Sequence, residues 1–237
     1  MSWFRTPSRL AEIPRLRPRA AQPISARVKF DELVPEPMAY LGQAAYLQLD
    51  QFERLSGIVA TAPDLESKEQ LSHAAGVALA KHHGLVAEIR RQGGDAAEVM
   101  RPFAPAVDRY QEVTGGADWY EALLSSYLTS GLLDDFFSRL AAGLPGELAR
   151  AVSALLDPDS GRHIIVDILA AAIERDAGLG SRLALWGRRL VGDTLLVARS
   201  ALEASGGLSH DDERVEPVFT DLIAEHTRRM DRLGLTA

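Results

Sequence analysis

The sequence predicts an all-α protein: a four-helix bundle with a long crossover between helices two and three, plus two C-terminal helices. Three observations predict this fold class. Apolar residues recur every three or four positions over long segments, which is the period of an amphipathic helix. No segment sustains the alternation of apolar and polar residues that marks a half-buried strand. Stretches that contain Gly or Pro separate the periodic segments, as expected for connections between helices.

The first helix is expected over 38–60 and the second over 66–91. Pro63 separates the two segments, and Gly93 follows the second in a position where glycine commonly ends a helix. The apolar positions of the first helix are Leu41, Ala45, Leu49, Phe52, Leu55 and Val59. Those of the second are Leu71, Ala75, Leu79, one of His82 and His83, Val86 and Ile89.

The connection to the third helix spans roughly residues 93–117 and includes a short helix expected around 104–113. This connection is too long for a tight turn between antiparallel helices, and it is long enough to cross the length of a bundle. The third long helix is expected over 118–142, with Asp118 as its N-terminal cap.

The fourth helical region begins near Glu147, is interrupted at 157–161 and continues through Ala177. Two further helices are expected over 181–204 and 212–233. Four long helices with a long crossover between the second and the third form the ferritin-like topology, in which metals or ligands bind at the buried face of the bundle.

The chain divides into a basic, Pro-containing arm over 1–37 and a helical domain over 38–237. Residues 1–30 hold seven basic residues and one acidic residue, so they carry +6 and the remaining residues carry −13. The acidic body argues against a nucleic-acid partner. The arm is expected to pack along the body. The alternatives are a disordered arm and an arm that contacts phosphate or lipid headgroups.

The composition excludes several classes of protein. The chain has no cysteine, so disulfide scaffolds, zinc–thiolate sites, iron–sulfur clusters and thiol nucleophiles are excluded. No run of about 18 apolar residues occurs, so no transmembrane helix and no membrane partner are expected. The sequence also lacks a Gly-rich phosphate loop, a GxSxG motif and an HExxH motif. These features fit a cytoplasmic protein.

Five stretches of the body carry a family resemblance. They are YLGQAAY (40–46), RPFAPAVD (101–108), GADWYE (116–121), RLALWGRRLVG (182–192) and HTRRM (226–230). They resemble the actinobacterial ferritin-like proteins related to the MiaE-type tRNA hydroxylases, over about residues 38–235. The resemblance implies a bundle that in its oxygenase relatives holds two irons. Each iron takes a carboxylate from one helix and an acid-x-x-His pair from the next.

The corresponding positions hold other residues here, so the di-iron motif is degenerate. Gln48 stands where the first helix would supply an acid, and the second helix offers Leu79-x-x-His82 without an acid. On the third helix only one of Asp134 and Asp135 can face inward, because adjacent helical residues point in different directions. On the fourth helix, no acid-x-x-His pair leads to the histidine, which is preceded by Asp159 and Ser160.

We therefore expect the core cavity to bind a hydrophobic small molecule and to support cofactor-free acid–base chemistry. The reaction would be a cyclisation, an isomerisation or a hydrolysis in specialised metabolism. Histidine next to a carboxylate suits such chemistry, since burial favours the neutral base and the carboxylate orients the ring. The catalytic candidates are His82, His163, Asp167 and Asp134. The substrate-binding candidates are Gln48, Tyr127, His83 and Leu79.

Several alternatives remain open at this point. One is an iron- and dioxygen-dependent hydroxylase of the MiaE-like type, and another is a non-catalytic ligand-binding or structural bundle. A mononuclear metal site from His82, His163, Asp167 and Asp134 is a third. No cofactor is favoured, and iron is the alternative. A homodimer with two-fold symmetry is the expected assembly. The sequence leaves open which of His82 and His83 faces the core. The histidines without an evident partner are expected at the surface: His73, His210 and His226.

Overall fold

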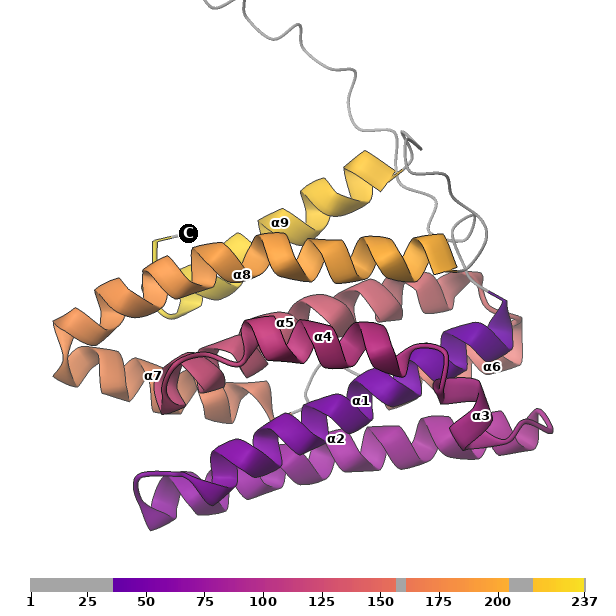
Figure 1. Cartoon of the computed structure of the whole chain (residues 1–237), viewed down its shortest axis with the longest axis horizontal. Helices are drawn as coiled ribbons and strands as arrows, with labels where there is room; N and C mark the ends of the chain where they lie inside the picture. The colour runs from indigo at the N-terminus through magenta and orange to yellow at the C-terminus, as the bar shows by residue number, and fades with distance from the viewer. Residues whose placement is uncertain (1–35, 157–160, 205–214, 237) are drawn as a thin grey trace, which may run out of the picture.

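A computed structural model describes residues 36–156, 161–204 and 215–236 of the chain (Figure 1). These residues form nine α-helices and one 3₁₀ turn, with no strand among them, which confirms the predicted all-α class. The arm up to residue 35, the interruption at 157–160 and His210 lie outside the described residues. The helices are α1 (Pro37–Ala60), α2 (Leu65–Arg91), α3 (Ala96–Met100), α4 (Ala104–Thr114), α5 (Trp119–Leu140), α6 (Gly146–Leu155), α7 (Arg162–Arg175), α8 (Ala177–Ala204) and α9 (Val215–Arg232), and the 3₁₀ turn is Ala141–Gly143.

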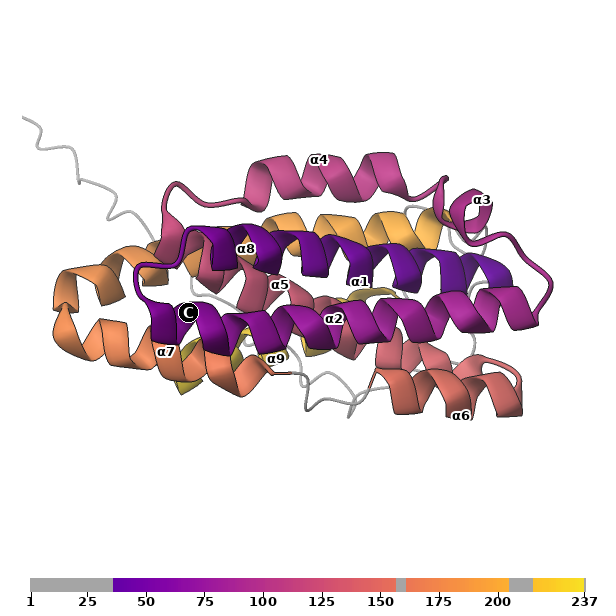
Figure 2. The same ribbon diagram turned by 90° about the horizontal axis from the view of Figure 1, so that it is seen from below.

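Helices α1 and α2 form a hairpin and pack against each other along most of their length (Figure 2). The start of α1 is fixed by Glu36, whose carboxylate accepts hydrogen bonds from the backbone N–H groups of Met38 and Ala39 at 3.0 and 3.1 Å. The start of α2 is fixed by Asp64, which accepts from the N–H of Ser67 at 2.7 Å. Both caps satisfy backbone donors that have no partner within the first turn.

Helices α3 and α4 connect α2 to α5 and lie on the outside of α1. In Figure 2, α4 runs along one side of the molecule beyond α1, and α8 lies behind it. Two hydroxyl contacts, one exposed and one buried, fix α4 in place. Tyr46 on α1 donates to Asp108 at 2.6 Å, and the Tyr110 hydroxyl lies 2.6 Å from the Thr194 hydroxyl on α8. The connection between α2 and α5 is therefore packed against α1 and α8.

Helix α5 is the most central helix and contacts α1, α7, α8 and α9. Its N-terminus carries a reciprocal cap. The Asp118 carboxylate accepts from the N–H of Glu121 at 3.0 Å, and the Glu121 carboxylate accepts from the N–H of Ala117 at 2.8 Å. This arrangement satisfies two backbone donors at once and fixes where the helix begins.

Helices α6 and α7 lie on the side of α2 that faces away from α4, one at each end of α2 (Figure 2). Helix α7 also packs on α5. The bundle interior is therefore enclosed by α1, α2, α5 and the α6–α7 pair. Helices α8 and α9 cover α5 from the other side (Figure 1). None of the described helices is long and apolar enough to cross a membrane.

The apolar core consists of two clusters. The first joins the N-terminal half of α1 and the C-terminal halves of α2 and α5 with α3, α4, α6 and part of α9; it includes Tyr40, Leu85, Phe136, Val152 and Leu222. The second joins the opposite ends of α1, α2 and α5 with α7, α8 and α9; it includes Leu71, Leu124, Leu169, Leu183 and Met230. Buried polar residues lie between the two along α1, α2 and α5: Gln48, Lys81, His82, Ser126 and Thr129. We call these five residues and Asp134 the polar layer.

Candidate functional site

The centre of the polar layer is a carboxylate that accepts from two helices. Gln48 on α1 donates through its amide to one oxygen of Asp134 on α5, at 2.7 Å. Lys81 on α2 donates through its ammonium to the other oxygen, at 3.2 Å. The side chains of Lys81 and Asp134 are 7% and 9% exposed. An amide, an ammonium and a carboxylate thus meet where three helices face one another.

These residues do not fit the di-iron centre that the family resemblance implies. An ammonium has three N–H donors and no lone pair, so Lys81 cannot bind a cation. It places a positive charge beside the Asp134 carboxylate, and the buried Asp50 carboxylate on α1 is already paired with Arg54, whereas two cations would need several free carboxylates. The described residues contain no group of three or more His, Cys, Asp or Glu side chains that could hold a metal ion. The predicted alternative of a mononuclear site finds no support in this geometry.

Burial shows which of the two adjacent histidines on α2 faces the interior. His82 is 9% exposed and its Nδ1 lies 2.9 Å from the carbonyl oxygen of Ala45 on α1. A carbonyl only accepts, so Nδ1 carries a proton and the ring is fixed against α1. His83 is exposed, and Leu79 is half-buried. The inward histidine is therefore His82, and it is engaged with backbone.

In the described part of the chain, the cavities that border the polar layer are much smaller than the ligand-sized apolar cavity predicted from the sequence. Two cavities border Gln48 and Asp134, and each has a volume of about 20 Å³. That is room for roughly one water molecule. The prediction assumed that empty apolar space takes the place of the lost metal ligands. The space is filled by Lys81 and by the hydroxyl-bearing residues of α5.

Three of the predicted residues meet in a different place. A cavity of about 460 Å³ between α5, α7 and α9 is lined by Tyr127, His163 and Asp167. His163 and Asp167 are exposed and one helical turn apart on α7, whereas Tyr127 is 1% exposed. We call this space the α7–α9 cavity. The remaining lining residues are Asp135, Arg162, Val166, Glu225, Arg229 and Arg232. The structure thus separates these three from His82, Asp134 and Gln48.

Arg229 on α9 forms the floor of this cavity. Its side chain is 6% exposed, and its Nη2 donates to the carbonyl of Gly131 at 2.9 Å and to the Asp135 carboxylate. Tyr127, Gly131 and Asp135 are spaced by four residues, so they share one face of α5. A Cβ at Gly131 would lie 2.4 Å from Arg229 Nε, so only glycine lets the guanidinium approach α5 this closely.

Two donors on residues that line the cavity have no partner within the described part of the protein. They are the hydroxyl of Tyr127 and Nη1 of Arg229, and both atoms are buried. A buried polar group without a hydrogen bond costs about 1–3 kcal/mol, so native structures keep few of them. Both groups can donate to an oxygen atom of a bound molecule.

His226, expected at the surface, is 3% exposed, so that prediction was wrong. Burial, reinforced by the neighbouring Arg229, lowers the pKa of His226 to about 4. The imidazole is therefore neutral at pH 7. The surface prediction failed because α8 covers this face of α9, which the spacing of α9 alone does not reveal. His73 is exposed, as expected.

Sequence reasoning missed two important residues, Lys81 and Arg229. The signal for Lys81 was present: it lies three residues after Ala78 and four before Leu85, on the buried stripe of α2. Arg229 lies in the HTRRM stretch, which was used only as one of the stretches that carry the family resemblance. Long basic side chains are usually assigned to the surface, and both of these are buried.

Comparison with known proteins bears on the fold. A family model described as a ferritin-like domain of actinomycetes matches residues 29–209, which is more than half of the chain. No curated protein matches the chain at a significant level.

Proposed function

Because the chain belongs to the family of actinomycete ferritin-like domains, we propose that it is a metal-independent member that binds a small molecule in the α7–α9 cavity and performs acid–base chemistry there. The observation that carries the proposal is the pair of buried donors without partners, Tyr127 Oη and Arg229 Nη1. Under this proposal the relation to the MiaE-type hydroxylases is one of scaffold and crossover topology, with the di-iron chemistry lost.

The two donors define the part of the ligand that they would bind. A carbonyl oxygen between Tyr127 Oη and Arg229 Nη1 would satisfy both. Donors fixed in a buried site stabilise negative charge that develops on such an oxygen. Arg229 is held in place by Gly131 and Asp135, so it does not need to reorganise when the charge forms. The preferred ligand is a small molecule with a carbonyl group.

His163 and Asp167 supply the second half of the chemistry. His163 would take a proton from the carbon next to the ligand's carbonyl group, giving an enolate whose oxygen is bound by Tyr127 and Arg229. Returning the same proton to another carbon completes an isomerisation, with no oxidant or reductant. Asp167 lies one turn along α7 and would stabilise the imidazolium. General acid–base catalysis by a positioned group contributes typically about 10²–10⁴-fold.

The polar layer contributes to the structure of the bundle and not to the proposed reaction. The Lys81 ammonium balances the charge of Asp134 inside the bundle, so the interior needs no metal cation for neutrality. We assign Gln48, Lys81, His82 and Asp134 to the maintenance of the bundle. His83 and Leu79 have no assigned role in the reaction.

A model isomerisation tests the catalytic proposal. Cyclohex-3-enone is converted to cyclohex-2-enone by moving one proton, and the conjugated product is followed by its ultraviolet absorbance. We expect turnover above the buffer rate and a loss of at least about tenfold in Tyr127→Phe and in His163→Asn, within the range for a lost acid–base group. Equal rates for the wild type and both variants would contradict the proposal. Ligand binding without turnover would favour the non-catalytic alternative.

The metal content of the protein tests the proposal that this family member is independent of metal. The protein is loaded anaerobically with Fe(II), desalted, and analysed by plasma mass spectrometry. We expect no stoichiometric iron in the wild type. About two irons per chain would overturn the assignment of Lys81 and Asp134 and restore the hydroxylase alternative.

A further inference from the structure

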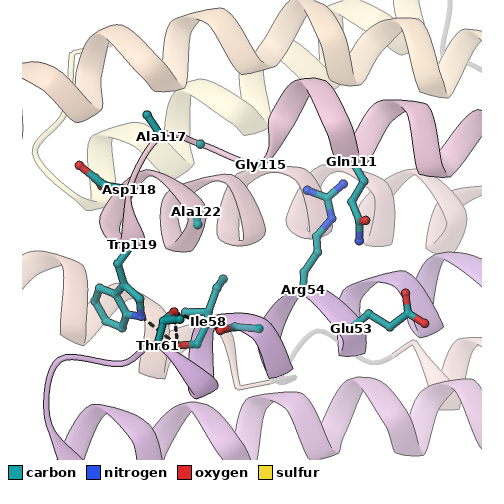
Figure 3. Close-up of a pocket in the computed structure, with 12 residues that line it drawn as sticks. Glu53, Arg54, Ile58, Thr61, Gln111, Gly115, Ala117, Asp118, Trp119 and Ala122 are labelled. Atoms are coloured by element: carbon teal, nitrogen blue, oxygen red, sulfur yellow. Dashed lines mark hydrogen bonds between the residues drawn. The ribbon is translucent and has the colours of Figure 1, made fainter.

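A larger cavity opens on the other side of the molecule, between the C-terminal half of α1, the end of α4 and the start of α5 (Figure 3). Its volume is about 620 Å³, which is the size of a small-molecule site. We call it the α1–α5 cavity. Its lining residues are Glu53, Arg54, Gly57, Ile58, Thr61, Gln111, Gly115, Gly116, Ala117, Asp118, Trp119 and Ala122. None of these residues lines the α7–α9 cavity.

Arg54 provides a buried cationic group in this cavity. Its side chain is 8% exposed, and it extends from α1 toward Gln111 on α4 (Figure 3). Nε donates to the Asp50 carboxylate at 3.0 Å, and Nη1 donates to the Thr114 hydroxyl at 3.1 Å. The guanidinium carbon lies 5.5 Å from the centre of the Tyr110 ring. These contacts fix the plane of the guanidinium.

The remaining nitrogen of Arg54 is unsatisfied. Nη2 is buried and has no hydrogen-bond partner within the described part of the chain. A guanidinium nitrogen only donates, so the missing partner is an acceptor, and a carboxylate oxygen is the acceptor that arginine binds most strongly. A ligand oxygen bound beside Arg54 would supply this acceptor.

The opposite part of the cavity is apolar. Trp119 lies across the cavity from Arg54 (Figure 3), and its indole N–H donates to the carbonyl of Ile58 at 2.9 Å, which fixes the ring. Ile58 and Ala122 extend this wall. At Gly57 an added Cβ would meet no atom within 4 Å, so the space in front of α1 is open here. A ring-sized apolar group fits this wall.

Two acidic residues lie at the rim. Glu53 is exposed and forms no ion pair among the described residues, whereas Asp118 is paired with Arg182, so Glu53 contributes a negative charge near the opening. A second carboxylate on a ligand would be repelled by Glu53, as like charges at this distance raise the free energy of the complex. The rim therefore favours a ligand with one carboxylate.

We propose that the α1–α5 cavity binds a small monocarboxylic acid with an apolar, ring-sized body. The carboxylate accepts a hydrogen bond from Arg54 Nη2, and the ring packs against Trp119 and Ile58. This site is independent of the proposed function, because the two cavities share no lining residue.

The test uses 4-fluorophenylacetate, followed by fluorine NMR, with 4-fluorophenylacetamide as the neutral control. We expect the acid to bind at least fivefold more tightly than the amide. Glu53→Gln should strengthen binding of the acid a few-fold, and Arg54→Lys should weaken it at least fivefold. Equal affinities for acid and amide would overturn the role of Arg54.

Matched glycine substitutions locate the ligand. Gly57→Leu places a side chain in the open space of the cavity, and Gly76→Leu on α2 serves as control, because a Cβ at Gly76 also meets no atom within 4 Å. We expect at least a tenfold loss of affinity in the first variant and none in the second. Loss of binding in Tyr127→Phe, with Gly57→Leu unchanged, would place the ligand in the α7–α9 cavity and overturn the proposal.

Discussion

The Lys81 ammonium lies 3.2 Å from an oxygen of the Asp134 carboxylate, and both side chains are more than nine-tenths buried. The pair joins α2 to α5 across the interior of the bundle, and Gln48 joins α1 to the same carboxylate. Two opposite charges in this position neutralise each other. Each of them would be strongly destabilising without its partner.

Lys81→Met should therefore destabilise the protein by about 3–5 kcal/mol, since it leaves the Asp134 carboxylate buried without its counter-charge. Urea unfolding followed by circular dichroism measures the change. The double variant Lys81→Met/Asp134→Asn should recover most of the loss, because the Asn amide oxygen still accepts from Gln48. A double variant as unstable as the single one would show that the charges are not coupled.

Gly131→Ala should destabilise by about 1–3 kcal/mol, the usual cost of overpacking a filled site. The new Cβ would lie 2.4 Å from Arg229 Nε and would displace the guanidinium. Gly192→Ala on α8 is the control: its Cβ meets no atom within 4 Å, so it should stabilise by up to about 1 kcal/mol through helix propensity. Thermal unfolding of both variants measures their stability. Equal shifts of the melting temperature in Gly131→Ala and Gly192→Ala would contradict the prediction.

Asp118→Ala should lower stability by about 1 kcal/mol, since it removes the N-terminal cap of α5. Asp118→Asn keeps an oxygen that accepts from the N–H of Glu121, so it should retain most of the stability. It loses only the half-exposed ion pair with Arg182. Chemical denaturation distinguishes the two. If both variants lose the same amount, the ion pair and not the cap is the important interaction.

Acid should destabilise the protein through His226. The unfolded chain protonates this residue below its ordinary pKa of 6.5, whereas the folded protein protonates it only below about 4. Between these values the unfolded state binds more protons, so lowering the pH from 7 to 4.5 removes about 2 kcal/mol of stability. His226→Asn should reduce this part of the pH dependence. Unfolding free energies at both pH values measure the difference, and identical pH slopes would exclude the contribution.

Much of the fold could be predicted from the sequence, because it depends on local patterns. The 3.6-residue spacing of Leu41, Ala45 and Leu55 determines which face of α1 is buried. Asp118 followed by Glu121 marks the start of α5 in the sequence itself. The start of α8 was predicted at 181 and is observed at Ala177, because α8 follows directly after the cap of α7 at Asp176.

The site was harder to predict, because it depends on contacts between helices. The spacing of His163 and Asp167 indicated that they share a face of α7, and both line one cavity with Tyr127. No local pattern shows that Arg229, about one hundred residues from Tyr127, packs against Gly131. The sequence also shows that acids are missing from the positions of the di-iron ligands. It does not show that Lys81 occupies the space that the metal site would take.

The polar layer on α1, α2 and α5 lies between the two core clusters, so the molecule has two packed ends joined by α1, α2, α5, α8 and α9. Helix α6 belongs to one end and α7 to the other. A thermal fluctuation that loosens α7 breaks contacts within the second cluster only, and the first cluster can stay packed. Amide hydrogens of α6 and α7 should then exchange with different protection, even though both helices lie on α2. Cooperative unfolding of the whole protein depends on the helices that take part in both clusters.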